Sequence, residues 1–118
     1  MDLAAKLQIK PGTHVTILGT RPDGPDLSDL AQPPGGPAEA GAVIAFVVMA
    51  ADLAGAASTA IAAAREDRLA WVAYPKAGKL GTDLNRDSLA RAAADLGVQP
   101  VRQVALDDAW SALRFRPA

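Results

Sequence analysis

The sequence predicts a small α/β domain with a Rossmann-like, mostly parallel sheet and a C-terminal antiparallel hairpin. Two apolar runs, at 42–49 and 69–74, have the composition of buried strands, and each precedes a stretch with helical periodicity. Because this alternation produces parallel strands joined by crossover helices, we expect both runs inside one sheet. A length of 118 residues fits one domain spanning 1–118.

Composition and charge narrow the class of protein. Half of the residues are hydrophobic and the formal net charge is −1, which argues against electrostatic binding to nucleic acid or to a membrane. The absence of cysteine excludes thiol catalysis, disulfides and cysteine metal sites. Residues 1–10 lack the apolar core of a secretory signal, and the most apolar segment, 42–51, has about half the length of a membrane span. We therefore expect a cytoplasmic protein.

The N-terminal third predicts a short helix, a short strand and a long loop. Leu3 and Leu7 share one face of a helix that Pro11 ends. Residues 15–18 (VTIL) are largely β-branched and predict a strand. Proline and glycine then dominate 19–41, a length that is uncommon for a loop inside a compact domain. We interpret this loop as a surface excursion rather than a lid, because few of its groups can do chemistry.

The middle of the chain gives the clearest strand and a helix. Residues 42–49 (AVIAFVVM) form an unbroken apolar run, and a helix is expected at 52–65. The narrow apolar face of this helix comprises Leu53, Ala57, Ala60, Ile61 and Ala64.

A second strand–helix unit follows. The strand at 69–74 ends at Pro75, which lacks the amide hydrogen that the ladder needs. The next helix spans 86–96, with Asn85 as its N-cap and Gly97 just beyond its C-terminus. Its buried face comprises Leu89, Ala92, Ala93 and Leu96.

The chain ends in a predicted hairpin. A strand at 101–106 and a strand at 110–116 flank a turn at 107–109. In the last strand an inward face of Ser111, Leu113 and Phe115 alternates with an outward face of Ala112, Arg114 and Arg116.

Candidate ligand-binding residues follow the predicted strands, because open α/β sheets bind ligands beyond the carboxyl ends of their strands. The candidates are Lys76, Lys79, Thr82, Asp83, Asp107, Asp108 and Trp110. The two lysines and the amides of the next helix suit a phosphate, although neither a P-loop nor a GxGxxG turn is present. Helix capping and turn formation offer simpler roles for the carboxylates, and hairpin packing for Trp110.

No complete catalytic set is recognisable. The only histidine, His14, precedes a strand and is expected at the surface, and no serine lies in a GxSxG turn. Asp107 and Asp108 have no histidine or further acid nearby that would complete a metal site. Catalytic residues therefore stay unassigned, and neither a metal nor a cofactor is expected.

Three segments resemble a bacterial family known as a domain of unknown function. They are AWVAYPK, TDLNRDSL and QVALDDAWSAL, and the opening LAAKLQIKPG at 3–12 is similar as well. The matching positions are Tyr74, Pro75, Lys76, Thr82, Asp83, Leu84, Asp107, Asp108, Trp110, Ser111 and Leu113. The resemblance implies that the strand–loop–helix unit and the hairpin belong to one Rossmann-like fold, and it transfers no activity.

A weaker, fold-level similarity links the element order to the later half of class I methyltransferases, which end in a comparable hairpin. Those enzymes hold S-adenosylmethionine against a glycine-rich first turn and an acid ending the second strand. This chain has GTRP at 19–22 and no clear second strand there, which argues against that cofactor.

The leading hypothesis is a non-catalytic binding or protein-interaction module. The alternative is a small enzyme or sensor for an anionic metabolite at the carboxyl-end rim of the sheet, with methyl transfer third. The partner is accordingly a protein or a small anionic ligand. A homodimer through a sheet edge or the alanine-rich helices is one arrangement that the sequence allows.

Overall fold

Five strands form one mixed sheet in the order β1–β2–β3–β5–β4 in the computed structural model. The structure describes residues 3–9, 14–19, 41–76 and 81–118. The strands are β1 (Val15–Gly19), β2 (Ala42–Phe46), β3 (Leu69–Pro75), β4 (Val98–Ala105) and β5 (Trp110–Pro117). The predicted loop at 19–41 lies outside the described residues except at its two ends.

The sheet is mixed because the C-terminal hairpin inserts its second strand next to β3. β1, β2 and β3 pair in parallel, whereas β5 is antiparallel to both β3 and β4. The prediction of a mostly parallel sheet therefore holds for β1–β3 only, while the antiparallel hairpin is present as expected. β4 begins at Val98, three residues before the predicted start, because it pairs with β5 as far as Pro117.

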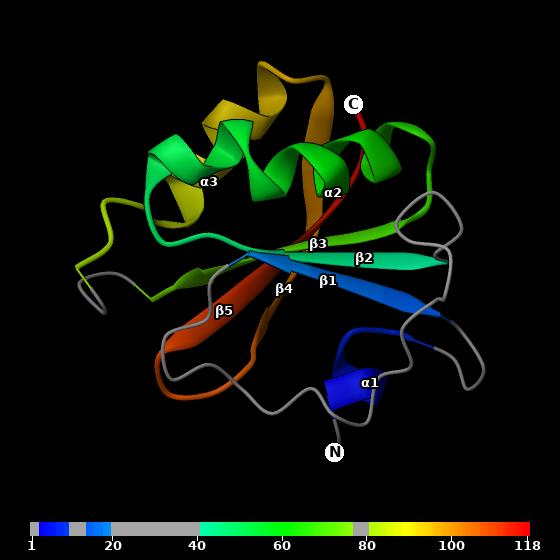
Figure 1. The fold of residues 1–118 in the computed structure, drawn as a ribbon, viewed down its shortest axis with the longest axis horizontal. Coiled ribbons are helices and arrows are strands. Elements are labelled where there is room, and N and C mark those ends of the chain that lie inside the picture. Colours follow the sequence, from blue (N-terminus) through cyan, green and yellow to red (C-terminus); the bar gives the residue numbers. More distant parts are fainter. Residues whose placement is uncertain (1–2, 10–13, 20–40, 77–80) are drawn as a thin grey trace.

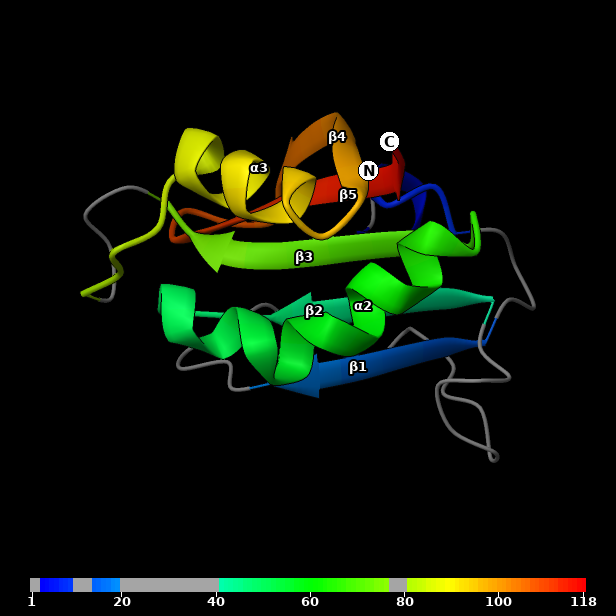
Figure 2. The ribbon, with the colours of Figure 1, turned by 90° about the horizontal axis from the view of Figure 1, so that it is seen from above.

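Two helices cover one face of the sheet. Figure 1 shows α2 (Ala56–Arg65) and α3 (Arg86–Ala94) on that face and the short α1 (Leu3–Lys6) on the other. Seen from above, α2 lies over β1–β3 and α3 lies on the side of β4 and β5 (Figure 2). The connections from β2 to β3 and from β3 to β4 advance in the same direction across the sheet, so right-handed crossovers place both helices on one face. Among the described residues, no helix is long and apolar enough to cross a membrane.

The predicted helix at 52–65 is interrupted near its start. A 3₁₀ segment, η2 (Ala50–Ala54), precedes α2, and Gly55 separates them. The Asp52 carboxylate accepts hydrogen bonds from the amides of Val48 and Met49, at 3.0 Å each. These bonds tighten the turn that follows β2, which is why the strand ends at Phe46 instead of continuing to 49.

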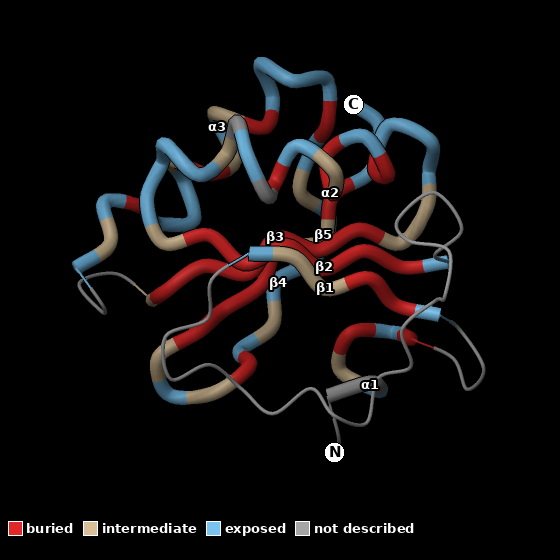
Figure 3. The backbone as a smooth tube through the Cα atoms, viewed as in Figure 1, coloured by how far each residue is buried: buried red, intermediate tan, exposed pale blue. Residues whose placement is uncertain are grey.

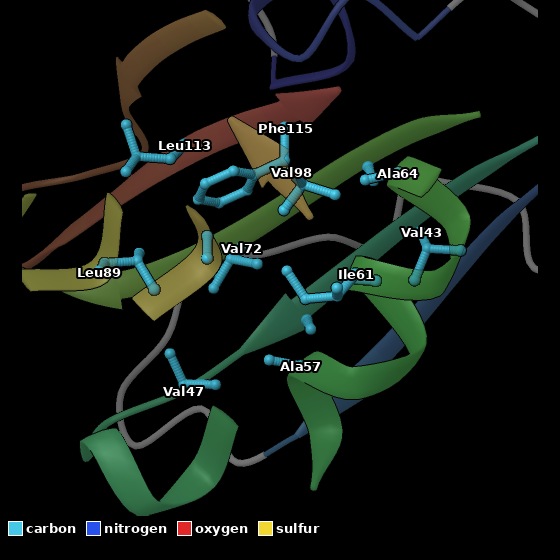
Figure 4. Close-up of a cluster of buried hydrophobic side chains, with 14 of the residues drawn as sticks. Val43, Val47, Ala57, Ile61, Ala64, Val72, Leu89, Val98, Leu113 and Phe115 are labelled. Carbon is cyan, nitrogen blue, oxygen red and sulfur yellow. The ribbon is translucent and has the colours of Figure 1, made fainter. Parts of the chain in front are cut away.

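The face under α2 and α3 carries an aliphatic core. Its members come from both helices, from β2–β5 and from the segment before α3, and Figure 4 shows how they interdigitate. The buried members include Val43, Val47, Ala57, Ile61, Ala64, Val72, Leu89, Val98, Leu113 and Phe115. The alanines of α2 let that helix lie close to the sheet. Leu96, which was predicted to be buried with them, is 36% exposed because α3 ends at Ala94.

The opposite face carries an aromatic core. The rings of Phe46 and Trp110 meet edge to face, with centroids 5.2 Å apart and planes at 72°. The indole N–H of Trp71 donates to the carbonyl of Leu7, 3.0 Å away, which fixes the N-terminal segment against the sheet. All four side chains are buried.

The predicted alternation in the last strand is wrong for its first half. Trp110, Ser111, Ala112 and Leu113 are all buried, as the continuous buried stretch of β5 in Figure 3 shows. β5 is an interior strand with a core on each face, so both of its sides are covered. Only towards the end does a side chain reach solvent, where Arg116 pairs with Asp67 at 3.0 Å.

The outer strand β4 is irregular. Its register with β5 shifts between Pro100 and Arg102, and Val101 at the shift is 47% exposed.

At the other end of the chain, His14 is exposed as predicted, and its carbonyl accepts hydrogen bonds from the amides of Gly41 and Ala42.

Candidate functional site

Thr82 and Asp83 join two turns at the carboxyl end of the sheet. The Thr82 hydroxyl donates to the carbonyl of Val48 and accepts the amide of Leu84 at 3.0 Å. The Asp83 carboxylate accepts the amide of Ala50 at 2.7 Å. These bonds tie the segment before α3 to the turn after β2. Thr82 and Asp83 therefore both have structural partners. The sequence could not identify Val48 and Ala50 as these partners, because each lies more than 30 residues away along the chain.

The acidic turn between β4 and β5 is closed by one of its own carboxylates. Asp107 accepts the amides of Ala109 and Trp110, at 2.8 Å each, which is the hydrogen bonding of an Asx turn. Asp108 is exposed. Trp110 packs into the aromatic core and is 0% exposed, so its ring faces no ligand cavity. These three candidates do not converge on one site.

Lys76 lies at a cavity of about 580 Å³ above the end of β3. Its backbone amide donates to the carbonyl of Ala109 at 2.8 Å, so the chain leaving β3 stays attached to the β4–β5 turn. The cavity is lined by Tyr74, Lys76, Asn85, Arg86, Asp87, Gln103 and Ser111. Lys79, the second predicted lysine, lies outside the described residues.

The cavity exists because α3 must cross β5 to reach β4. β3 supplies Tyr74, β5 supplies Ser111 directly opposite in the register, and β4 supplies Gln103. The N-terminus of α3 closes the remaining side through Arg86. Tyr74 and Ser111 lie within the resembling segments, but the sequence alone does not indicate them as ligand-binding residues, because their juxtaposition depends on β5 pairing with β3.

Two hydroxyl groups face this cavity as hydrogen-bond donors. The Tyr74 oxygen accepts a hydrogen bond from Gln103 Nε2 at 3.1 Å, which leaves its own proton for a ligand. Burial raises the pKa of Tyr74 above its usual value of 10.0, so the phenol is protonated at neutral pH. Ser111 is 6% exposed and lines the cavity, where its hydroxyl can donate to a ligand.

The charged groups at the cavity favour an anion. Lys76 and Arg86 are cationic, and the one acid among the lining residues, Asp87, has an 82% exposed side chain 3.5 Å from the Arg86 guanidinium. Water screens an exposed carboxylate of this kind more than it screens half-buried Lys76. The net field at the cavity is therefore positive.

The first turn of α3 adds backbone donors to the same rim. Asn85 and Ser88 form a reciprocal capping box, with bonds of 2.9 and 3.0 Å between each side chain and the other's amide. This box confirms the predicted N-cap. The amides of Arg86 and Asp87 are not used by it, and they lie at the positive end of the helix dipole.

A second cavity of about 440 Å³ lies between the two helices. Leu53, Ile61 and Leu96 give it an apolar lining, and Arg65 and Asp95 add one charge of each sign.

Across the described ranges, no three histidine, cysteine, aspartate or glutamate side chains are grouped as a metal site would require. Comparisons of the chain with protein-family models, with curated proteins and with solved structures found no match.

Proposed function

We propose that this protein is a non-catalytic binding module for a small anionic molecule, which occupies the cavity at the end of β3. The observation that carries the proposal is the convergence of Lys76, Arg86 and Ser111 on that cavity, together with the free proton of Tyr74. All four offer donors, and three come from different elements of the fold. Donors that converge on one concave site are the usual basis of anion recognition.

Binding without turnover is favoured by the use of the carboxylates. A carboxylate can act as a general acid or base only when it lies within reach of the ligand. Asp83 and Asp107 are instead occupied by backbone amides, and Asp87 points into solvent. An enzyme or sensor acting on the same anion is the second candidate, and methyl transfer is the third.

We also propose that the fold is Rossmann-like and that the chain belongs to the bacterial family that its three segments resemble. The carboxyl end of the parallel strands β1–β3 is where α/β sheets usually bind ligands. The three segments that resemble the bacterial family each contribute to the cavity at this end, through Lys76, Arg86 and Ser111. Their shared location supports one functional site as the reason for the resemblance, and a cytoplasmic, ligand-binding role fits it.

A thermal-shift screen tests the proposal. The panel comprises sugar phosphates, nucleotides, carboxylates, S-adenosylmethionine and divalent metals. An anion at 100 times its Kd should stabilise the native state by about 2.7 kcal/mol, a shift of several degrees. The shift should be lost in Lys76→Ala and retained in Arg91→Ala, which removes the same charge from an exposed position on α3.

If no anion of the panel shifted the melting temperature, the proposal would be contradicted. The protein-interaction alternative would then lead, with the apolar cavity between α2 and α3 as the first surface to examine. Conversion of a bound anion into product, lost in Lys76→Ala, would replace the binding module by the enzyme.

A further inference from the structure

We infer that the anion is the phosphate monoester of a small organic molecule, with the phosphate held by Lys76, Arg86 and Ser111. This inference rests on the proposed function and narrows it to one ligand class. It depends on the number of donors, on the balance of charge and on the size of the cavity.

The donors outnumber what a carboxylate can use. An ammonium, a guanidinium and two hydroxyls line the cavity, and two uncapped amides lie at the start of α3. A carboxylate has two oxygens in one plane, whereas a phosphate monoester has three terminal oxygens arranged as a tripod. Donors that come from β3, β5 and α3 approach from several directions, which suits the tripod.

The buried hydroxyl of Ser111 is the observation that points to a ligand independently of the helix terminus. Its side chain is 6% exposed and lines the cavity, directly opposite Tyr74 in the β3–β5 register. The hydroxyl can therefore donate a hydrogen bond to a ligand that occupies the cavity. A phosphate oxygen at the start of α3 would accept this hydrogen bond.

The charge of the site is positive. Lys76 and Arg86 supply two positive charges and Asp87 supplies one negative charge, and the Arg86–Asp87 pair has side chains that are 58% and 82% exposed. A phosphate monoester carries about −1.5 to −2 at neutral pH, compared with −1 for a carboxylate. The dianion therefore gains more from both cations than a single carboxylate does.

The cavity is larger than a bare phosphate requires. Its volume of about 580 Å³ falls within the roughly 300–1,000 Å³ that sites for small organic molecules occupy. Gln103 keeps its carbonyl oxygen as an acceptor, because only its Nε2 is engaged with Tyr74. A body that carries hydroxyl groups would find this acceptor next to the phenol.

Calorimetric titration of the full chain with matched probes tests the inference. The probes are inorganic phosphate, glucose 6-phosphate and glucuronate, which carries a carboxylate where the sugar phosphate has its phosphoryl group. We expect glucose 6-phosphate to bind roughly tenfold more tightly than glucuronate, and more tightly than inorganic phosphate. Amide spectra should show shifts at Lys76, Arg86 and Ser111.

Matched variants locate the effect. Arg86→Gln should weaken glucose 6-phosphate roughly tenfold, while Arg91→Gln on the exposed side of the same helix leaves binding unchanged. Ser111→Ala should weaken the binding of glucose 6-phosphate several-fold. Thr16→Val is its control, because Thr16 is also a buried β-strand residue with a hydroxyl group, but it does not line the cavity.

The outcomes separate this inference from the proposed function. Glucuronate binding as tightly as glucose 6-phosphate, at the same amides, would overturn the phosphate assignment and leave the anion site standing. If inorganic phosphate bound as tightly as glucose 6-phosphate, the organic part of the ligand would contribute nothing to affinity, and the assignment of an organic phosphate would be overturned. Absence of binding by all three probes would overturn this inference, whereas the proposed function would be contradicted only if the whole anion panel gave no thermal shift. Amide shifts confined to residues between α2 and α3 would overturn both proposals.

Discussion

Three aspartates near the carboxyl end of the sheet accept hydrogen bonds from backbone amides. Asp52 holds the turn after β2, Asp83 connects that turn to the segment before α3, and Asp107 closes the β4–β5 turn. Carboxylates satisfy amides that would otherwise lack partners in tight turns. A polar rim of this kind resembles an active site in the sequence, although most of its acids shape the backbone.

The two buried tryptophans differ at a single atom in a way that unfolding experiments can detect. Trp71 Nε1 donates to the carbonyl of Leu7, whereas Trp110 Nε1 has no partner among the residues that the structure describes. Phenylalanine removes the same volume and keeps an aromatic ring at both positions. We expect Trp71→Phe to cost about 1 kcal/mol more free energy of unfolding than Trp110→Phe, because it also leaves the Leu7 carbonyl without its donor.

Urea unfolding of the two variants measures the difference. The comparison requires equal m-values, because a change in m would mean a change in the unfolded state or a loss of two-state behaviour. Equal midpoints for the two variants would show that the Trp71 hydrogen bond contributes nothing to stability.

At the scale of helices and strands, the sequence predicted the features that depend on neighbouring residues, such as helix caps. The Asn85 cap and the Gly97 position were read from the sequence, and the structure has the cap and a Gly97 φ of +88°. The break at Gly55 was not predicted, because it follows from bonds between Asp52 and the preceding turn. The burial of both faces of β5 was missed as well, since it depends on which strand β5 joins.

The turn before α2 should be sensitive to pH through Asp52. Hydrogen bonds from the amides of Met49 and Val48 lower the pKa of this carboxyl below its ordinary 3.8. A lowered folded-state pKa means that the stabilisation is fully present above about pH 3.8 and is lost as the pH falls through the folded value. Asp52→Ala should therefore destabilise the protein by roughly 0.5 kcal/mol at pH 7, because water screens this exposed carboxylate, and by progressively less below about pH 3.8.

Unfolding free energies of the wild type and Asp52→Ala, measured from pH 7 down to pH 2, check this expectation. The difference between the two curves should narrow only below about pH 3.8. A difference that stays constant over the whole range would assign the effect to the side-chain volume and not to the charged acceptor.

At the scale of the whole molecule, strand order determines which parts open first. Among the described strands, β2, β3 and β5 are interior, and β1 and β4 are the edges. Opening an interior strand exposes both cores, so it requires nearly complete unfolding. Native-state hydrogen exchange should therefore be slowest for ladder amides of β3 and faster for those of β1 and β4. Equal protection of β4 and β3 would contradict this order.

The same strand order explains how far the site could be predicted. Lys76 was identifiable because it directly follows a buried strand. Tyr74 and Ser111 become neighbours only when β5 pairs with β3, and Gln103 reaches Tyr74 only when β4 lies beyond β5. No periodicity in the sequence fixes that order, because it results from competition among whole-sheet arrangements.

The irregular outer strand bears on how the molecule behaves when it is concentrated. A regular edge presents a row of unpaired backbone groups, on which the strand of another molecule can align and begin fibre growth. In β4 this row is interrupted, because Pro100 has no amide hydrogen and the register shift at Arg102 bends the strand. Intermolecular sheet extension at this edge is therefore unfavourable, and the fold carries its own protection against aggregation there.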